Sequence, residues 1–247
     1  MDKNLVRNDE TLDDLQLKGI KVIQKKNGFR FGIDAVLLAN YTKVKNGDRI
    51  VDLCSGTGII PFIIAGKTDA ERITGVEIQK DMIDMANRSV KYNTLENKLD
   101  FINADLKDLK VLKSIGLVDI VTVNPPYKIY GTGLINENDK NAMSRHEIFC
   151  NLDNVIEAAR ILLKDKGRFF MIHRPERIAD IMCSMRKYKI EPKVIRMIHP
   201  SYNKAPSMVL IEGQKSGKMF LKWERALYVY NENNEYTKEV KEIYGIK

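Results

Sequence analysis

Residues 119–127 are Asp-Ile-Val-Thr-Val-Asn-Pro-Pro-Tyr. A predicted strand is thus followed directly by an asparagine, two prolines and a tyrosine. The nearly continuous β-branched run predicts a short buried strand of a parallel sheet. Prolines lack the backbone donor that a sheet requires, so the strand must end before them. Open α/β sheets bind their ligands at the carboxyl ends of their strands. The candidate catalytic residues are therefore Asn124, Pro125 and Tyr127.

A turn with two glycines follows an earlier predicted strand, Arg49–Leu53. Gly56 and Gly58 would let the backbone approach a ligand closely. A dinucleotide fingerprint would need a third glycine where this chain has Pro61, and the Gly-Lys-Ser/Thr of a phosphate-binding loop is absent as well. Asp52, four residues before Gly56, aims a carboxylate at the ligand. A carboxylate disfavours a pyrophosphate and favours a cation, and the sulfonium of S-adenosylmethionine meets that need.

Two more acids follow the next predicted strands. Glu77 stands about twenty residues beyond the glycine turn, where an acid in such folds binds ribose hydroxyls. Ile78 could then pack on an adenine, and Asp105 could accept a hydrogen bond from the adenine amino group. Each acid alone could equally be a helix cap or a solvated charge, and Asp105 could be a turn residue. Their common position at strand ends favours one joint site.

Alternating strands and helices predict an α/β fold, doubly wound, with a parallel sheet and helices on both faces. The last two predicted strands are joined by a loop, which predicts an antiparallel pair at the sheet edge. We also expect an N-terminal hairpin over 15–31 with its turn near 26–28, a short strand pair in 220–230 and a short helix over 237–244. The other predicted strands are 49–53, 73–78, 100–103, 119–123, 168–172, 193–198 and 208–212. The other predicted helices are 35–41, with Asp34 as its cap, 59–65, 80–92, 152–163 and 175–188.

The composition favours a polyanionic partner. The 247 residues include 41 Lys and Arg against 33 Asp and Glu, which gives a net charge of +8. Such an excess points first to nucleic acid, although a Lys-rich protein without that partner is the alternative. The three cysteines form no metal or disulfide pattern, and no apolar run reaches the roughly 20 residues that cross a bilayer. With a polar N-terminus, we expect a cytoplasmic protein with no metal and no membrane partner.

In this order, Asp52-x-x-x-Gly56-x-Gly58, Glu77, Asp105 and Asn124-Pro125-Pro126-Tyr127 resemble the motifs of class I S-adenosylmethionine-dependent methyltransferases that act on amino groups. The resemblance implies a Rossmann-like fold with a seven-stranded, mostly parallel sheet and an antiparallel edge strand. Most relatives have a glycine where this chain has Cys54, so the turn is expected to be less open here. The implied cofactor-binding residues are Asp52, Ser55, Gly56, Gly58, Glu77, Ile78, Asp105 and Asn124.

The strand-terminal tetrapeptide suits methylation of an exocyclic amine. Such an amine is a poor nucleophile because its lone pair is delocalised into the base ring. The side-chain oxygen of Asn124 and the carbonyl of Pro125 could accept its two N–H bonds and favour a tetrahedral nitrogen. Tyr127 would stack on the extruded base, a contact worth about 1–3 kcal/mol. The structural alternative is a strand-ending turn with a packed tyrosine.

Asn-Pro-Pro-Tyr enzymes methylate adenine in DNA, a purine in RNA or a glutamine amide of release factors. Only about fifty residues precede the glycine turn, fewer than the glutamine enzymes usually have, and 247 residues leave no room for the recognition domain of a DNA enzyme. Four further segments resemble the bacterial tRNA1(Val) adenine-N6 methyltransferase family: 28–39, 52–61, 173–177 and 204–208.

This resemblance implies methylation of adenosine 37 in tRNA, and Phe31 and Asp34 would line the cofactor pocket. A release-factor glutamine N5-methyltransferase and a non-catalytic RNA-binding protein on the same fold remain alternatives. We expect a single domain over 1–247, with an N-terminal extension (1–45), a catalytic core (46–215) and a C-terminal extension (216–247). We also expect a monomer.

Overall fold

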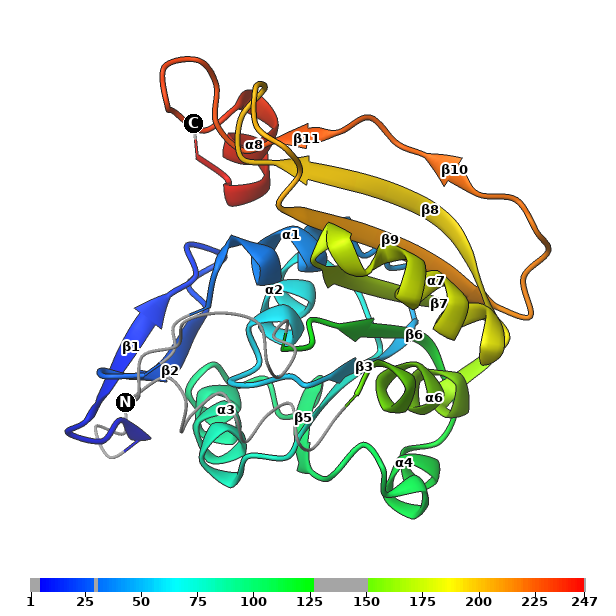
Figure 1. The fold of residues 1–247 in the computed structure, drawn as a ribbon. Helices are drawn as coiled ribbons and strands as arrows, with labels where there is room; N and C mark the ends of the chain where they lie inside the picture. Colours follow the sequence, from blue (N-terminus) through cyan, green and yellow to red (C-terminus); the bar gives the residue numbers. More distant parts are fainter. Residues whose placement is uncertain (1–4, 29–30, 127–150, 247) are drawn as a thin grey trace, which may run out of the picture.

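The computed structural model describes residues 5–28, 31–126 and 151–246, and a large sheet forms its centre (Figure 1). The sheet has nine strands in the order β10-β8-β9-β7-β6-β3-β4-β5, with β11 paired to β8. Its strands are β3 (Arg49–Leu53), β4 (Arg72–Glu77), β5 (Leu99–Asn103), β6 (Val118–Val123), β7 (Leu163–His173), β8 (Ile190–His199), β9 (Met208–Lys215), β10 (Lys222–Trp223) and β11 (Leu227–Tyr228). The described helices are α1 (Ile33–Tyr41), α2 (Ile59–Lys67), α3 (Lys80–Tyr92), α4 (Leu109–Ile115), α6 (Leu152–Leu162), α7 (Ile178–Lys187) and α8 (Lys238–Tyr244), with a 3-10 turn η2 (Pro175–Arg177) before α7.

The predicted fold class is confirmed. Leaving out the two short strands β10 and β11, the sheet has the seven expected strands. Only β9 runs antiparallel to its neighbours, and it lies between β7 and β8, one position inside the edge at which we expected it. The loop 200–207 that joins β8 to β9 explains the direction, because a parallel return needs a crossover of about a dozen residues or more.

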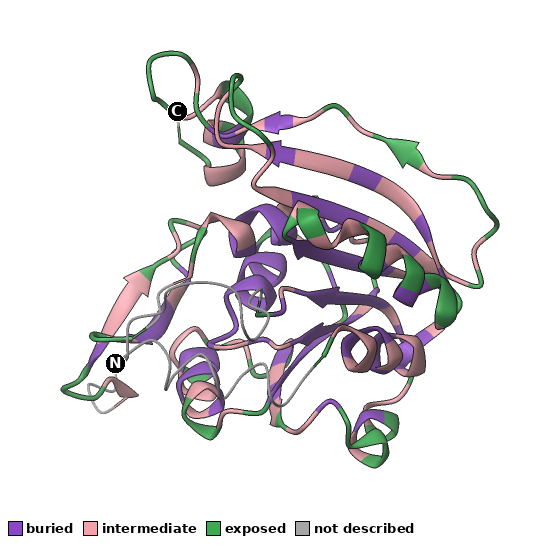
Figure 2. Ribbon diagram, in the orientation of Figure 1, coloured by how far each residue is buried: buried purple, intermediate pink, exposed green. Residues whose placement is uncertain are grey.

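Successive residues of the central strands point to opposite faces of the sheet and pack in two different hydrophobic cores. In β3, Ile50 packs with α1, α2 and α3 on one face of the sheet, whereas Val51 and Leu53 pack with α4, α6 and α7 on the other. β7 alternates in the same way, and its four residues 169–172 are all fully buried. Figure 2 shows the result, a buried sheet centre between two layers of helices. α3, α4 and α7 have exposed residues, whereas α1 and α2 are mostly buried. Burial on both faces is why these strands are nearly continuous apolar runs.

The N-terminal hairpin forms, but the predicted position of its turn is wrong. β1 (Glu10–Asp14) pairs antiparallel with β2 (Lys21–Lys25), so the turn spans 15–20 and not 26–28. Gln16, Lys18 and Gly19 make this turn with positive φ angles of 51°, 49° and 75°. Asn-Gly at 27–28 is a strong turn signal, but β2 ends before it, where the Lys26 N–H donates to the Asp9 carbonyl at 2.9 Å.

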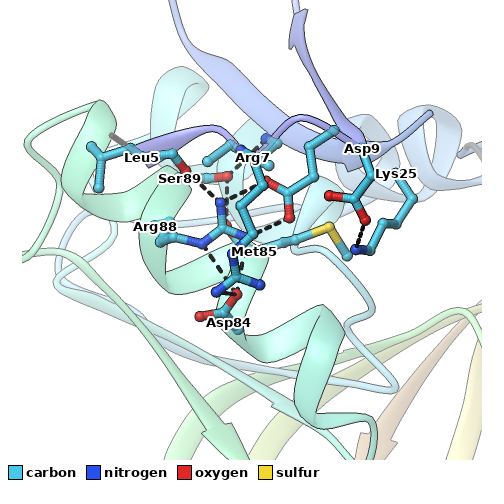
Figure 3. A network of polar contacts seen from close by, with 10 residues as sticks. Leu5, Arg7, Asp9, Lys25, Asp84, Met85, Arg88 and Ser89 are labelled. Carbon is cyan, nitrogen blue, oxygen red and sulfur yellow. Dashed lines mark hydrogen bonds and ion pairs between the residues drawn. The ribbon is translucent and has the colours of Figure 1, made fainter. Parts of the chain in front are cut away.

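The hairpin is fastened to α3 by buried polar contacts (Figure 3). Arg88 donates to both carboxylate oxygens of Glu10 at 2.7 Å, and the Glu10 side chain is fully buried. The same guanidinium contacts Asp84 at 2.9 Å. At the next residue of the helix, the Ser89 hydroxyl accepts from the Ile23 N–H at 2.9 Å. Side chains of α3 thus satisfy backbone groups of β2, which holds the hairpin against the side of the sheet domain.

The other differences from the predicted elements lie near the chain's surface. α4 was not predicted; Asp108 caps it by accepting from the N–H groups of residues 110 and 111. Two short strands form within 220–230, but the prediction that they pair with one another is wrong. β10 and β11 each pair with β8. The C-terminal helix α8 begins after Thr237, whose hydroxyl accepts from the Val240 N–H.

Candidate functional site

The carboxyl ends of four parallel strands meet at one edge of the sheet, which we call the carboxyl edge. Leu53 of β3 is in register with Val76 of β4 and with Val123 of β6. One residue further, Glu77 of β4 pairs with Asn103 of β5. The strand-end residues that the sequence predicted for the site are therefore brought to this edge by register alone.

The glycine turn at 54–58, which we call the cofactor turn, uses three residues with positive φ. Gly56 has a φ of 54°, with open space where a side chain would begin. At Gly58, with a φ of 88°, a Cβ would lie 2.3 Å from the ring of Phe101. Cys54 adopts a φ of 57° despite its side chain, which costs roughly 1–2 kcal/mol. The strain falls at the residue where relatives were expected to have glycine.

Asp52 is the most deeply buried carboxyl of the site. It is fully buried in β3, and its Oδ1 accepts from the Thr122 hydroxyl at 2.6 Å. Burial raises the pKa of Asp52 to about 8, the Thr122 hydrogen bond opposes that rise, and the charge of Glu77 adds to it. Among the described residues, its Oδ2 has no hydrogen-bond partner. A buried acceptor without a donor is costly, so this atom is suited to a ligand donor or cation.

A second buried oxygen of the turn also lacks a partner in the described part of the chain, the hydroxyl of Ser55. Ser55 is 8% exposed, and its N–H donates to the Val76 carbonyl at 3.1 Å. The residues present thus fit a ligand that is both cationic and polar, because they offer a carboxylate oxygen, a hydroxyl and a closely approachable backbone. S-adenosylmethionine has an ammonium and a sulfonium, so its chemistry matches this set of groups.

Glu77 braces the cofactor turn. Its Oε2 accepts from the Gly56 N–H at 3.0 Å, and its Oε1 accepts from the Gln79 N–H at 3.0 Å. The side chain therefore ties the turn after β3 to the turn after β4. Ile78 follows with 38% of its surface exposed, as a residue that packs on a ligand ring would be. The ribose contact of Glu77 and the adenine contact of Ile78 remain predictions.

Asp105 has the role that we considered as the alternative to cofactor binding. Its Oδ1 accepts from the Lys107 N–H at 2.9 Å, and its Oδ2 lies 3.6 Å from the Lys107 ammonium. It is thus a turn residue after β5. The carboxylate keeps further lone pairs at the same edge of the sheet, so its contact with the adenine amino group remains a prediction.

Asn124 stands directly after β6, and its amide reaches the N-terminal part of the chain. Its Nδ2 donates to Oδ2 of Asp34 at 3.0 Å. Asp34 lies inside the first turn of α1, so its predicted role as the helix cap is wrong; the N-cap residue is Gly32. Pro125 is buried behind it. Phe31 packs against the core that α1 and α2 share. Tyr127 lies outside the described residues, so its stacking role remains a prediction.

A contact that no sequence pattern indicated joins the hairpin to the cofactor turn. The amide of Gln24 in β2 donates to the Thr57 hydroxyl at 2.7 Å, and both residues are buried. The pair is separated by 33 positions, and it depends on how the hairpin packs on α3. An uncharged residue inside an amphipathic strand carries no local signal for such a role.

His173 is the last residue of β7. Burial lowers the pKa of His173 to about 4, and its Nδ1 accepts from the Arg174 N–H at 2.8 Å, so this histidine is a neutral structural group. Within residues 5–28, 31–126 and 151–246, no three or more His, Cys, Asp or Glu side chains cluster as metal ligands would. In the same ranges, no helix has the length and apolar character to cross a membrane.

Comparisons with known proteins agree with this geometry. The sequence family described as "Methyltransferase domain" matches residues 44–237. A tRNA1(Val) (adenine(37)-N6)-methyltransferase of Phocaeicola vulgatus is 26% identical over 92% of this chain and 95% of its own. One of Haemophilus influenzae is 23% identical over 89% and 91%.

Among solved structures, a protein of Agrobacterium tumefaciens described as a predicted O-methyltransferase superposes with a TM-score of 0.70 at 22% identity, covering 86% of this chain and 95% of its own. The tRNA m1G37 methyltransferase of M. jannaschii superposes with a TM-score of 0.57 at 15% identity, over 86% and 59%. These likenesses concern the fold. The family match over residues 44–237 shows that the chain belongs to the methyltransferase domain family and is an S-adenosylmethionine-dependent methyltransferase.

Proposed function

We propose that this methyltransferase modifies the exocyclic N6 amine of an adenine in tRNA, with adenosine 37 of tRNA1(Val) as its substrate. The observation that carries the proposal is the place of Asn124 and Pro125, which directly follow Val123 at the carboxyl edge, in register with Leu53 before the cofactor turn. The names of the distant relatives support the choice of tRNA and of position 37. The net charge of +8 supports a phosphate-rich substrate.

The cofactor end of the site would be held by the residues that surround the cofactor turn. Asp52 and Ser55 would offer their buried oxygens to the polar end of the cofactor, and Gly56 and Gly58 would let the backbone approach it. Glu77, Ile78 and Asp105 would take the ribose and the adenine. S-adenosylmethionine, when bound, supplies the electrophilic methyl group. The protein's task is then to orient a weak nucleophile toward that end of the site.

Asn124 and Pro125 would perform this task with two acceptors. The side-chain oxygen of Asn124 and the main-chain carbonyl of Pro125 would each accept one N–H of the substrate amine. Both bonds draw the nitrogen out of conjugation with the ring, and both oxygens stabilise positive charge as it develops on the nitrogen. No proton has to be removed before the transfer, and the methylated nitrogen, which is then cationic and acidic, would lose its extra proton to water. No strong general base is therefore required. Tyr127 would hold the extruded base by stacking, and basic side chains would bind tRNA phosphates.

The test uses methyl-labelled S-adenosylmethionine with unmodified tRNA1(Val) transcript, and the same transcript with guanosine at position 37 as the matched control. Digestion to nucleosides should give label in N6-methyladenosine from the first transcript and none from the second. Label in a Gly-Gly-Gln release-factor peptide but in neither RNA would replace the proposal by glutamine methylation. Cofactor binding without transfer to any of these substrates would point to a non-catalytic RNA-binding protein.

A further inference from the structure

The hydrogen bond between Asn124 and Asp34 determines which way the Asn124 amide faces. A carboxylate has only acceptors, so the Asn124 atom 3.0 Å from Asp34 Oδ2 must be the nitrogen. The two polar atoms of a planar amide point in different directions. The amide oxygen is therefore directed away from Asp34. This matters because Asn124 is useful to an amine substrate only as an acceptor. A flipped amide would present N–H donors to the N–H donors of the substrate.

Asp34 is itself held in place by the start of α1. Its second oxygen, Oδ1, accepts from the Ala35 N–H at 3.0 Å. The residues that follow, 35–39, are all buried in the core, so packing holds the first turn of α1 in place. At Gly32, a Cβ would lie 2.8 Å from Oδ1 of Asp34. The glycine thus leaves the space that this carboxylate occupies.

We propose that Asp34 is a positioning residue that locks the amide of Asn124 with its oxygen toward the substrate amine. The proposal rests on the proposed function, because it assigns Asn124 an amine to receive. A hydrogen bond from Nδ2 to a charged acceptor also polarises the amide and makes its oxygen a stronger acceptor. The contact spans 90 positions in the chain, so an N-terminal helix outside the predicted catalytic core contributes to the rate of the reaction.

Exchanging the two side chains, first one at a time and then together, tests this directly. Asp34→Asn keeps the shape but no longer dictates the orientation of Asn124, so kcat should fall roughly 10- to 100-fold. Asn124→Asp places two carboxylates face to face and should lose at least as much. In the double variant, the amide at 34 donates to the carboxylate at 124, whose other oxygen accepts from the substrate. Its kcat should exceed that of Asn124→Asp about tenfold or more.

The matched control is Asp81→Asn, since Asp81 is the acid in the first turn of α3 and is exposed. Its kcat should equal that of the natural protein. In Asp34→Asn and in the double variant, kcat should fall by a much larger factor than the affinity for S-adenosylhomocysteine, and the Tm should stay near that of the natural protein. A merely structural role of Asp34 would lower kcat, affinity and Tm together and give no rescue. An unchanged kcat in Asp34→Asn, or a double variant no better than the product of the two single losses, would overturn the proposal.

A measurement without turnover separates this proposal from the proposed function. In protein labelled with 15N at asparagine, the side-chain amide of Asn124 should give one shifted and exchange-protected pair of signals, assigned by its loss in Asn124→Asp. Asp34→Ala should move this pair toward ordinary values; signals that stay in place would refute the lock. If tRNA is not methylated, the exchange of the two side chains is repeated with the glutamine peptide, because its amide nitrogen also carries two N–H bonds.

Discussion

The cofactor turn and the strand end that carries Asn124 share one edge of the sheet but are held in different ways. Hydrogen bonds from two neighbouring strands hold the cofactor turn: Glu77 of β4 accepts from the N–H groups of Gly56 and Gln79, and Gln24 of β2 donates to Thr57. The amide of Asn124 donates to Asp34, a residue of α1 that lies 90 positions away in the chain. The cofactor turn is thus braced by side chains of β2 and β4, whereas the Asn124 amide is oriented by a side chain of α1.

The difference predicts two kinds of variant. A change near the cofactor turn should mainly alter cofactor binding or stability. The effect of one substitution there should be moderate, because several contacts hold the turn. A change at Asn124 should mainly alter the rate, because its oxygen has its full effect only as charge develops in the transition state. Four variants test this division, from the largest expected effect to the smallest.

Asn124→Ala should lower kcat by about 10²–10³-fold, the usual cost of removing one preorganised group that stabilises transition-state charge. The affinity for S-adenosylhomocysteine should change less than about threefold, because binding residues of the cofactor turn are untouched. Single-turnover kinetics and calorimetry separate the two quantities. Turnover at the natural rate would contradict the mechanism, and an equal loss of both quantities would contradict the division between the two regions.

Asp52→Asn should change the pH dependence of stability. Because the pKa of Asp52 is raised to about 8 in the folded protein against an ordinary 3.8, the folded state binds the extra proton between these values. Stability from this group is full below pH 4 and is lost as pH rises to 8. The variant has no such loss. Its Tm relative to the natural protein, without cofactor, should rise by at least ~3 °C between pH 5 and pH 9.

A difference in Tm that does not change with pH would show that Asp52 is already ionised in the cofactor-free protein. The matched control is Asp105→Asn, because Asp105 lies at the same edge of the sheet but only partly buried. Its Tm relative to the natural protein should be nearly constant over the same range. The measurement requires no substrate, so it stands apart from the question of what is methylated.

The cofactor side could be predicted from the sequence to a large extent because its geometry is local. Two glycines in a strand-to-helix turn, an acid before them and an acid after the next strand follow from chain spacing and parallel register. The same reasoning placed Asn124 at the end of β6, because prolines stop a strand. The antiparallel direction of β9 followed from the loop that precedes it, although its place between β7 and β8 did not.

The contacts that could not be predicted are those made by the hairpin and by α1. Gln24 with Thr57 and Asp34 with Asn124 join residues 33 and 90 positions apart. Both depend on where an extension packs, and no local pattern encodes that. The hairpin turn was misplaced for a related reason: Asn27-Gly28 is a good local signal, but Ser89 and Arg88 of α3 fix the position of β2 and hence the end of the strand.

Gln24→Leu should weaken cofactor binding by about 3- to 10-fold, because it removes one buried hydrogen bond that supports the turn. The kcat at saturating cofactor should stay near its natural value, since the strand end that carries Asn124 is not touched. Calorimetry with S-adenosylhomocysteine measures the first quantity and turnover the second. Gln214→Leu, at an exposed glutamine contact far along β9, is the control and should change neither. A loss confined to kcat would contradict the conclusion that the hydrogen bond between Gln24 and Thr57 supports cofactor binding.

Cys54→Gly should have the smallest effect, a gain in the free energy of unfolding of up to ~1 kcal/mol. Glycine adopts the observed φ of 57° without steric cost, but it also gives the unfolded chain more freedom, so the two effects largely oppose one another. Urea unfolding measures the balance. A destabilisation of more than ~1 kcal/mol would mean that contacts of the Cys54 side chain outweigh its backbone strain, and that this chain has adapted its turn to cysteine.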